Sequence, residues 1–265
     1  MPNLRHIYEL KQKYSNLNSQ DLELKEYFDE VLKKDTLRKA FDSGILSETR
    51  DVKLFSFVNE SISNDKPEVI KYFEENKEEE VTLLFIDITS FSKIIKDWEN
   101  NKIKEYLDRY YKQIIPIIYK WGGEIEKLMG DGIICVFGKP FMEIPIPLSV
   151  YQAEYCAEEV IKKFFNTDKN VKVAIHTDKV HYYKVPGRDY CEYTMIGQAM
   201  TELFRLESVS VSNAINFFSK SKYDRFGWEK SIFDVNLINF QTAEINTLQG
   251  VDYSEIKQIK FPLFS

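Results

Sequence analysis

Two stretches carry the clearest pattern of apolar and polar positions in the chain. Residues 81–86 are apolar or β-branched and are followed at once by Asp87, which predicts a buried strand ending in a carboxylate. Residues 122–138 contain two short apolar segments joined by Gly130-Asp131-Gly132, which predicts a β-hairpin with Asp131 at its tip. If these strands pair, both carboxylates project from the same edge of one sheet.

The chain after this hairpin alternates between helix and strand patterns. Helices are expected through residues 94–98, 103–118, 149–165 and 198–206. Strands are expected at 171–176, 180–185, 193–197, 214–218, 232–240, 242–248 and 256–263, with turns at 177–178 and 186–187. This alternation indicates an α/β (α+β) fold with a mixed, mostly antiparallel sheet covered by helices.

The N-terminal region differs, because its apolar residues recur at helical spacing among many charged residues. Residues 1–50 predict two amphipathic helices, residues 52–58 a short strand or another helix, and a further helix begins near Pro67 and ends in the acidic run Glu78–Glu80. We therefore divide the chain into a helical extension, 1–79, and a main domain, 80–265. The extension is interpreted as a packing or dimer arm, with ligand sensing as the alternative.

Charge and cysteine content narrow the class of protein. The 265 residues carry 36 Lys and Arg against 42 Asp and Glu, and this net charge of −6 argues against bulk binding of nucleic acid or of an anionic membrane. The 3 cysteines are widely spaced and odd in number, which favours a reduced environment and indicates no zinc site. With no secretion signal and no apolar run long enough to span a bilayer, a cytoplasmic protein is expected.

The two carboxylates predict a metal site. Paired acidic groups at one sheet edge are costly unless a hard cation binds them, so we expect Asp87 and Asp131 to bind a divalent cation. The alternative is that Asp131 is only a turn residue, since Asp-Gly is common in hairpins. The segment 88–92 predicts a tight turn into a helix, whose backbone N–H groups suit a polyphosphate.

These motifs resemble the catalytic core of class III nucleotidyl cyclases. That core has a strand ending in F-x-D-I-x-x-F, matched here from Phe85 to Phe91, followed by a G-G…K-x-x-G-D hairpin, matched from Gly122 to Asp131. The resemblance runs from about residue 80 to the C-terminus. It implies that a nucleoside triphosphate is cyclised to its 3′,5′-cyclic monophosphate, with pyrophosphate leaving, at an interface shared by two subunits of a homodimer. For this reaction we expect two Mn²⁺ or Mg²⁺ ions per site, bound by Asp87, Asp131 and the backbone carbonyl of Ile88.

The resemblance also implies roles for residues that the partner subunit supplies. Lys127 and Thr194 match the family's two base-reading positions, and Arg205 matches the arginine that stabilises the transition-state phosphate. Lys179 matches a frequent phosphate-binding cation, although a solvated surface lysine is an equal reading. Thr201 stands where the family usually has Asn, and we expect it to be catalytic together with Arg205. The full set of expected substrate contacts is Phe85, Thr89, Ser90, Phe91, Ser92, Lys127, Lys179 and Thr194.

Three departures from the family pattern set this chain apart: Thr201, Asp178 in place of Gly, and Gln249 in place of Lys. The divergent segment around Thr201 resembles that of the bacterial pyrimidine cyclases of anti-phage defence, whose cyclic CMP or cyclic UMP activates a separate cyclic-nucleotide-binding effector. The base itself stays open at this stage. Adenine and cytosine present the same acceptor-beside-amine edge to Lys127 and Thr194, and a hydroxyl and an ammonium can also donate to the carbonyls of uracil.

The leading hypothesis is a homodimeric, metal-dependent cyclase that uses CTP or UTP. An adenylate cyclase is the first alternative, and a catalytically inactive dimerisation or nucleotide-binding module is the second. A two-metal polymerase or nuclease would use similar carboxylates, but it needs a nucleic-acid track that the acidic composition does not indicate.

Overall fold

The structure, a computed structural model, describes residues 66–185, 192–219, 221, 239–245 and 248–260. The helices expected within residues 1–65 and the strand residues expected at 232–238 lie outside this range, so the proposed domain division stays a prediction. The described helices are α5 Lys66–Glu74, α6 Phe91–Ile94, α7 Asn100–Lys120, α8 Ile146–Phe164 and α9 Gln198–Val209. The strands are β1 Glu78–Ile88, β2 Glu124–Met129, β3 Gly132–Phe137, β4 Val171–Val185, β5 Glu192–Ile196, β6 Ala214–Phe218, β7 Asn239–Glu244 and β8 Glu255–Lys260.

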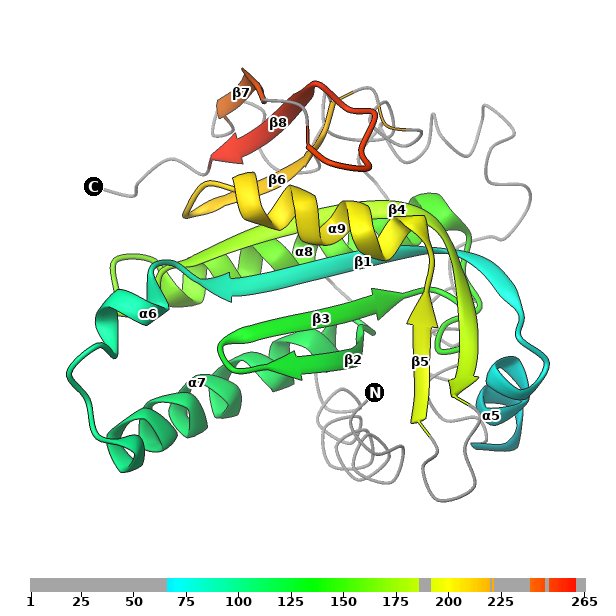
Figure 1. The fold of residues 1–265 in the computed structure, drawn as a ribbon, viewed down its shortest axis with the longest axis horizontal. Helices are drawn as coiled ribbons and strands as arrows, with labels where there is room; N and C mark the ends of the chain where they lie inside the picture. Colours follow the sequence, from blue (N-terminus) through cyan, green and yellow to red (C-terminus); the bar gives the residue numbers. More distant parts are fainter. Residues whose placement is uncertain (1–65, 186–191, 220, 222–238, 246–247, 261–265) are drawn as a thin grey trace, which may run out of the picture.

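One sheet of eight strands organises these elements, with helices on both of its faces (Figure 1). Its order is β2-β3-β1-β4-β6-β8-β7, and β5 pairs with β4 off this path. The β4–β6 pair is parallel, and the other pairs between the described strands are antiparallel. The expected fold class, a mixed and mostly antiparallel sheet covered by helices, is confirmed.

Strand β1 is buried on both faces, which explains its unbroken apolar run. Leu84 and Ile86 belong to the core formed with α7 and α8. Leu83 and Phe85 belong to a second core on the opposite face, where α9 packs. Because side chains alternate along a strand, Asp87 shares the α9 face with Phe85.

The turn expected at Thr177–Asp178 is wrong, because β4 continues through these residues as a single strand. Thr177 pairs with Thr82 and Asp178 with Val81 in the β1–β4 ladder. The hydroxyl groups of Thr82 and Thr177 also lie 3.0 Å apart in a buried hydrogen bond. Pairing along the full length of β1 therefore overrides the local turn preference of the polar dipeptide.

The acidic run Glu78–Glu80 was expected to end a helix, and this expectation is also wrong. Helix α5 ends at Glu74, and the acidic residues open β1 instead. Across the ladder, Glu78 accepts a hydrogen bond from the ammonium of Lys179 at 2.7 Å, so cross-strand charge pairing favours the extended form. Within the described residues, no helix has the length and apolar character needed to cross a membrane.

Candidate active site

The two predicted metal ligands meet where β1 ends. Asp87 is the penultimate residue of β1, and Asp131 lies in the turn between β2 and β3. The antiparallel register, which sets Ile86 opposite Ile133, brings this turn beside the end of β1. On the other side of the turn, the Tyr111 hydroxyl of α7 donates a hydrogen bond to the carbonyl of Gly130 and fixes the hairpin tip.

Electrostatics at this pair favour a shared proton or a bound cation. Burial, the charge of Asp131 and a hydrogen bond between the two carboxyl groups raise the pKa of Asp87 to about 6. Burial also raises the pKa of Asp131, partly offset by hydrogen bonds from Asp87 and from the backbone of Ile88. The donor set is therefore all oxygen, and the ammonium beside it, that of Lys172, is shared with Glu207, so the cluster keeps a negative charge that fits Mg²⁺ or Mn²⁺.

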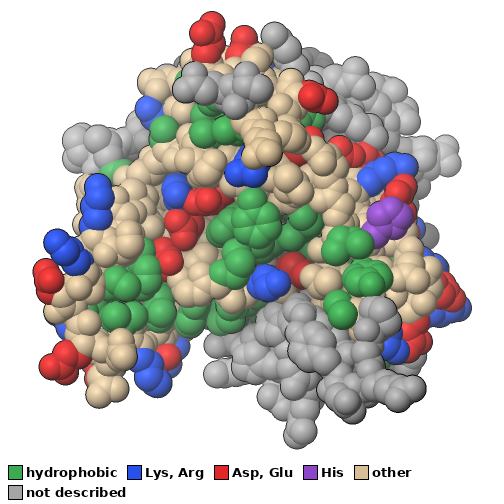
Figure 2. Space-filling view, viewed as in Figure 1, with side chains coloured by type: hydrophobic (Ala, Val, Ile, Leu, Met, Phe, Trp, Pro, Cys, Tyr) green, Lys and Arg blue, Asp and Glu red, His purple; other side chains and the backbone are tan. Residues whose placement is uncertain are grey.

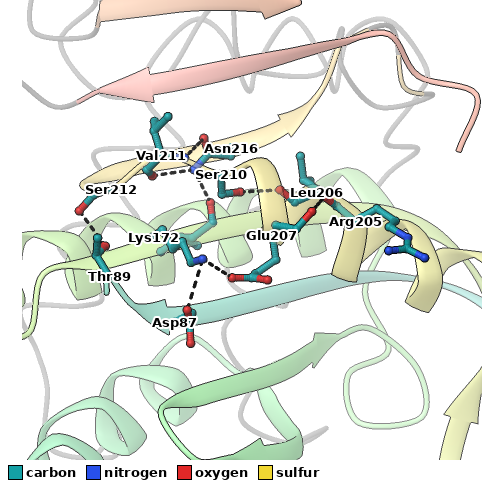
Figure 3. A network of polar contacts seen from close by, with 12 residues as sticks. Asp87, Thr89, Lys172, Arg205, Leu206, Glu207, Ser210, Val211, Ser212 and Asn216 are labelled. Carbon is teal, nitrogen blue, oxygen red and sulfur yellow. Dashed lines mark hydrogen bonds and ion pairs between the residues drawn. The ribbon is translucent and has the colours of Figure 1, made fainter. Parts of the chain in front are cut away.

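Lys172 is a third member of this cluster that the sequence analysis missed. It stands opposite Asp87 in the β1–β4 register, with its ammonium 3.4 Å from the Asp87 carboxylate and 2.5 Å from the Glu207 carboxylate of α9 (Figure 3). Burial works against its charge, but the hydrogen bond and charge of Glu207 raise the pKa of Lys172. The sequence contained one signal for this residue, a lysine between two valines on a predicted buried strand. The partners of that lysine could not be predicted, because they depend on the register between β1 and β4.

The turn after Asp87 is tied to neighbouring loops. The backbone N–H of Thr89 donates to the carbonyl of Asn170 at 2.8 Å, and its hydroxyl donates to Ser212 at 2.8 Å. Ser90 has a left-handed backbone with φ of 58° and precedes the short helix α6, in which Phe91 is half-buried and Ser92 exposed. The Thr89 amide and hydroxyl are therefore both bonded within the protein, and a substrate contact by Thr89, Ser90, Phe91 or Ser92 stays a prediction.

The two predicted base-reading residues lie on β2 and β5, two strands that the side chain of Glu126 connects. Lys127 and Thr194 are both half-buried, and the carboxyl group of Glu126 joins their strands. Glu126 accepts hydrogen bonds from the Thr194 hydroxyl at 3.1 Å and from the Met195 N–H at 3.2 Å. The positive charge of Lys127 also acts on this carboxyl group. Glu126 was not singled out from the sequence, because a glutamate beside a lysine in an alternating segment reads as a surface residue.

Helix α9 presents the two predicted catalytic residues outward. Thr201 and Arg205 are exposed and one helical turn apart, so they share one face of the helix. Figure 3 shows the Arg205 side chain directed away from Asp87. Between them, Phe204 is 39% exposed and packs edge-on against Phe85 with ring centres 5.5 Å apart. Phe85 itself is buried in the core.

Lys179 is not brought to the carboxylate pair of its own subunit. It follows Lys172 by seven residues on β4, which places it roughly 23 Å along the strand. Its ammonium instead lies 2.7 Å from Glu78. A phosphate contact by Lys179 therefore stays a prediction.

Comparison with known proteins identifies the family. The profile of the adenylate and guanylate cyclase catalytic domain matches residues 73–237, more than half of the 265 residues. The uncharacterized proteins Mb1354c of Mycobacterium bovis and Rv1320c of Mycobacterium tuberculosis are each 22% identical over 192 residues. These matches cover 70% of this chain but 33% of each relative, so the chain spans about a third of their length.

Solved structures show the same fold. The adenylyl cyclase CyaB from P. aeruginosa superposes with a TM-score of 0.55 at 19% identity, covering 71% of this chain and 97% of that one. The guanylate cyclase domain of RhGC from Catenaria anguillulae, solved with GTP, gives 0.55 at 21% identity and covers 70% and 98%. A non-canonical dimeric guanylyl cyclase domain of the RhoGC fusion protein from Blastocladiella emersonii gives 0.54 at 19% identity and covers 70% and 98%.

The family match over residues 73–237 includes both halves of the carboxylate pair, Asp87 and Asp131. The chain therefore belongs to the adenylate and guanylate cyclase catalytic domain family and is a class III nucleotidyl cyclase domain.

Proposed function

We propose that this protein is a homodimeric cyclase that converts a pyrimidine nucleoside triphosphate, CTP or UTP, to its 3′,5′-cyclic monophosphate and pyrophosphate. The observation that carries the proposal is the pair Asp87 and Asp131, which share a hydrogen bond at the end of β1. The product is proposed to be a second messenger for a separate cyclic-nucleotide-binding effector in anti-phage defence.

The carboxylates of Asp87 and Asp131, with the Ile88 carbonyl, are the proposed ligands for two Mn²⁺ or Mg²⁺ ions. Divalent ions bound there supply Lewis-acid activation of the ribose 3′-hydroxyl and charge neutralisation for the triphosphate. Lys172 holds Asp87 in place from β4, and Glu207 in turn orients Lys172. The carboxylates of Asp87 and Asp131 are thereby presented in a fixed arrangement before substrate arrives.

A second copy of the chain is proposed to complete the site. Arg205 is exposed on α9 and its side chain points away from Asp87 of the same subunit, and Thr201, one helical turn earlier, is also exposed, which suits residues that act across an interface. Figure 2 shows apolar side chains gathered on this side of the molecule, and among the described residues the exposed large apolar side chains are those of Ile196 and Phe204. Covering such a patch favours association. Arg205 would then donate to the negative charge that develops on the α-phosphate.

Two arguments bear on the base. The divergent segment around Thr201 supports a pyrimidine, because it resembles the pyrimidine branch of the family. The second candidate function, adenylate cyclase, is favoured by Lys127 and Thr194, whose spacing suits the edge of adenine as well as that of cytosine. Solved relatives of comparable similarity are described both as adenylyl and as guanylyl cyclases, so overall likeness does not select among bases.

The test is a product assay with the full chain. The purified protein is incubated with Mn²⁺ and each of CTP, UTP, ATP and GTP, and the products are separated by chromatography and identified by mass. We expect cyclic CMP or cyclic UMP with an equal amount of pyrophosphate, and no product from the Asp87→Asn variant. Conversion of ATP alone would establish the adenylate alternative, and conversion of no nucleotide would support an inactive module.

A further inference from the structure

Glu126 is a buried carboxylic acid that links two strands which do not pair with each other. Strand β2 lies at one end of the sheet and β5 pairs only with β4 among the described strands. The β2–β3 ladder is irregular between Ile125 and Lys127, and Glu126 occupies this bulge. Its side chain is 1% exposed and reaches β5 through the Thr194 hydroxyl and the Met195 N–H.

The two hydrogen bonds fix the direction in which the Thr194 hydroxyl points its proton. Both bonds end on the same oxygen, Oε1. The Met195 N–H can only donate, so Oε1 accepts that bond, and an acid proton is better placed on Oε2, which has no hydrogen-bond partner among the described residues. The Thr194 hydroxyl therefore donates to Oε1 in either protonation state of Glu126, and only its lone pairs remain for another partner.

Lone pairs on Thr194 discriminate between the two pyrimidines. Cytosine carries an exocyclic amine at C4, which can donate to Thr194. Uracil carries a carbonyl oxygen at the same position, so two acceptors would face each other. The Lys127 ammonium can donate to a ring nitrogen or to a carbonyl, and so does not distinguish them. From the sequence alone, the Thr194 hydroxyl could act as a donor or as an acceptor toward the base. Glu126 takes up the donor, so the acceptor lone pairs are the part that remains free.

We infer that Glu126 is a positioning residue that makes this site selective for an amino-bearing base edge, so that CTP is used in preference to UTP. This inference rests on the proposed function, because it takes Lys127 and Thr194 as the residues that meet the base. It narrows the proposal from two pyrimidines to one. By the same logic, ATP is accepted more readily than GTP.

The experiment compares nucleotide ratios, which a purely structural role of Glu126 would not change. kcat/KM is measured for CTP and UTP with the wild type, Glu126→Gln, Glu126→Leu and the pair Thr194→Ser and Thr194→Val. Binding of 3′-deoxy-CTP and 3′-deoxy-UTP, which lack the attacking hydroxyl, is measured by calorimetry in parallel. The Gln variant is the matched control, because its amide oxygen can accept both hydrogen bonds.

We expect the wild type to favour CTP at least about tenfold in both readouts, the size of effect that a mismatched polar contact produces. Glu126→Gln and Thr194→Ser should keep this ratio. Glu126→Leu frees the hydroxyl to donate, and Thr194→Val removes it, so both should bring the ratio toward one even if overall activity falls.

A wild type that prefers UTP would overturn the inference and leave the pyrimidine proposal standing. An unchanged ratio in Glu126→Leu, with both nucleotides equally impaired, would also overturn it and leave Glu126 as a strand link only. If no nucleotide is cyclised, the proposed function fails, and the ratio of the two 3′-deoxy nucleotides in the binding assay still decides the inference. Should Glu126→Leu not fold, Glu126→Ala, which also lacks an acceptor for the hydroxyl, takes its place, while Thr194→Val and Thr194→Ser test the hydroxyl itself.

Discussion

Lys172 lies directly across the β1–β4 register from Asp87, and its ammonium contacts both that carboxylate and Glu207. The contact joins the end of β1 to helix α9, which also carries Arg205 (Figure 3). One lysine therefore links the proposed metal ligands to the helix that presents the proposed phosphate-binding arginine. It keeps the half-buried carboxylates of Asp87, on β1, and Glu207, on α9, in a fixed arrangement.

Replacing this lysine should cost both stability and activity. Lys172→Met leaves Asp87 and Glu207 without their shared cation, and we expect the free energy of unfolding at pH 8 to fall by about 1 to 3 kcal/mol. Lys172→Arg keeps the charge and is the matched control. Urea denaturation and turnover are measured on both. If the Met variant unfolds at the same urea concentration as the wild type, the ion pairs contribute nothing to the fold.

Asp87→Asn should stabilise the metal-free protein while abolishing turnover. The pKa of Asp87 is raised to about 6, so the folded state binds the proton more tightly than the unfolded chain does. Stability is therefore lost as pH rises toward 6 and is lowest above it. At pH 8 in EDTA we expect a gain of about 1 kcal/mol, a value reduced for solvent screening of this half-buried group.

The matched control for this change is Asp97→Asn, an exposed residue between α6 and α7 that should leave stability unchanged. Thermal melts with and without Mn²⁺ provide the second readout. Mn²⁺ should raise the melting temperature of the wild type and of Asp97→Asn but not that of Asp87→Asn. An equal rise in all three would place the Mn²⁺ site elsewhere.

The elements with strong local patterns were predictable from the sequence. The apolar run before Asp87 and the Gly130-Asp131-Gly132 turn predicted β1 and the β2–β3 hairpin, and the structure contains both. That Asp87 and Asp131 lie close together followed from pairing β1 with the hairpin, because few strand registers bury the apolar residues of both.

What could not be predicted depends on contacts between distant segments. The turn expected at Thr177–Asp178 follows local preference, but the partner strand β1 is long enough to keep those residues extended. Lys172 and Glu126 read as ordinary polar residues of alternating strands. Their neighbours, Asp87 and Thr194, lie 85 and 68 positions away in the chain and become partners only through register and a bulge.

Glu154 gives the protein a pH-dependent stability that is independent of the site. This α8 residue is buried, and neither carboxylate oxygen has a hydrogen-bond partner among the residues the structure describes. Burial raises its pKa to about 8. The folded state thus holds the proton between the ordinary pKa and about 8, and stability falls as pH rises through this window.

Glu154→Gln should remove this dependence. The amide has the same shape and no charge to bury, so we expect the variant to match the wild type near pH 5. At pH 9 it should be more stable by about 2 to 4 kcal/mol. Urea denaturation across this range is the measurement, with the exposed Glu143→Gln as control. Parallel stability curves for wild type and Glu154→Gln would show that Glu154 ionises with the same pKa in the folded and unfolded states, and would contradict the prediction.

A site shared between two subunits predicts that two inactive variants can rescue each other. Asp87→Ala disables the metal-binding half and Arg205→Ala the half supplied by the partner, so each should be inactive alone. In a hybrid dimer, one of the two sites combines an intact Asp87 with an intact Arg205. Random exchange makes half of the dimers hybrid, so an equal mixture should recover about a quarter of wild-type activity.

Mixing Asp87→Ala with Asp131→Ala is the control and should recover nothing, because both carboxylates must come from the same subunit. Activity of Arg205→Ala alone near that of the wild type, or recovery in the control mixture, would contradict the shared site.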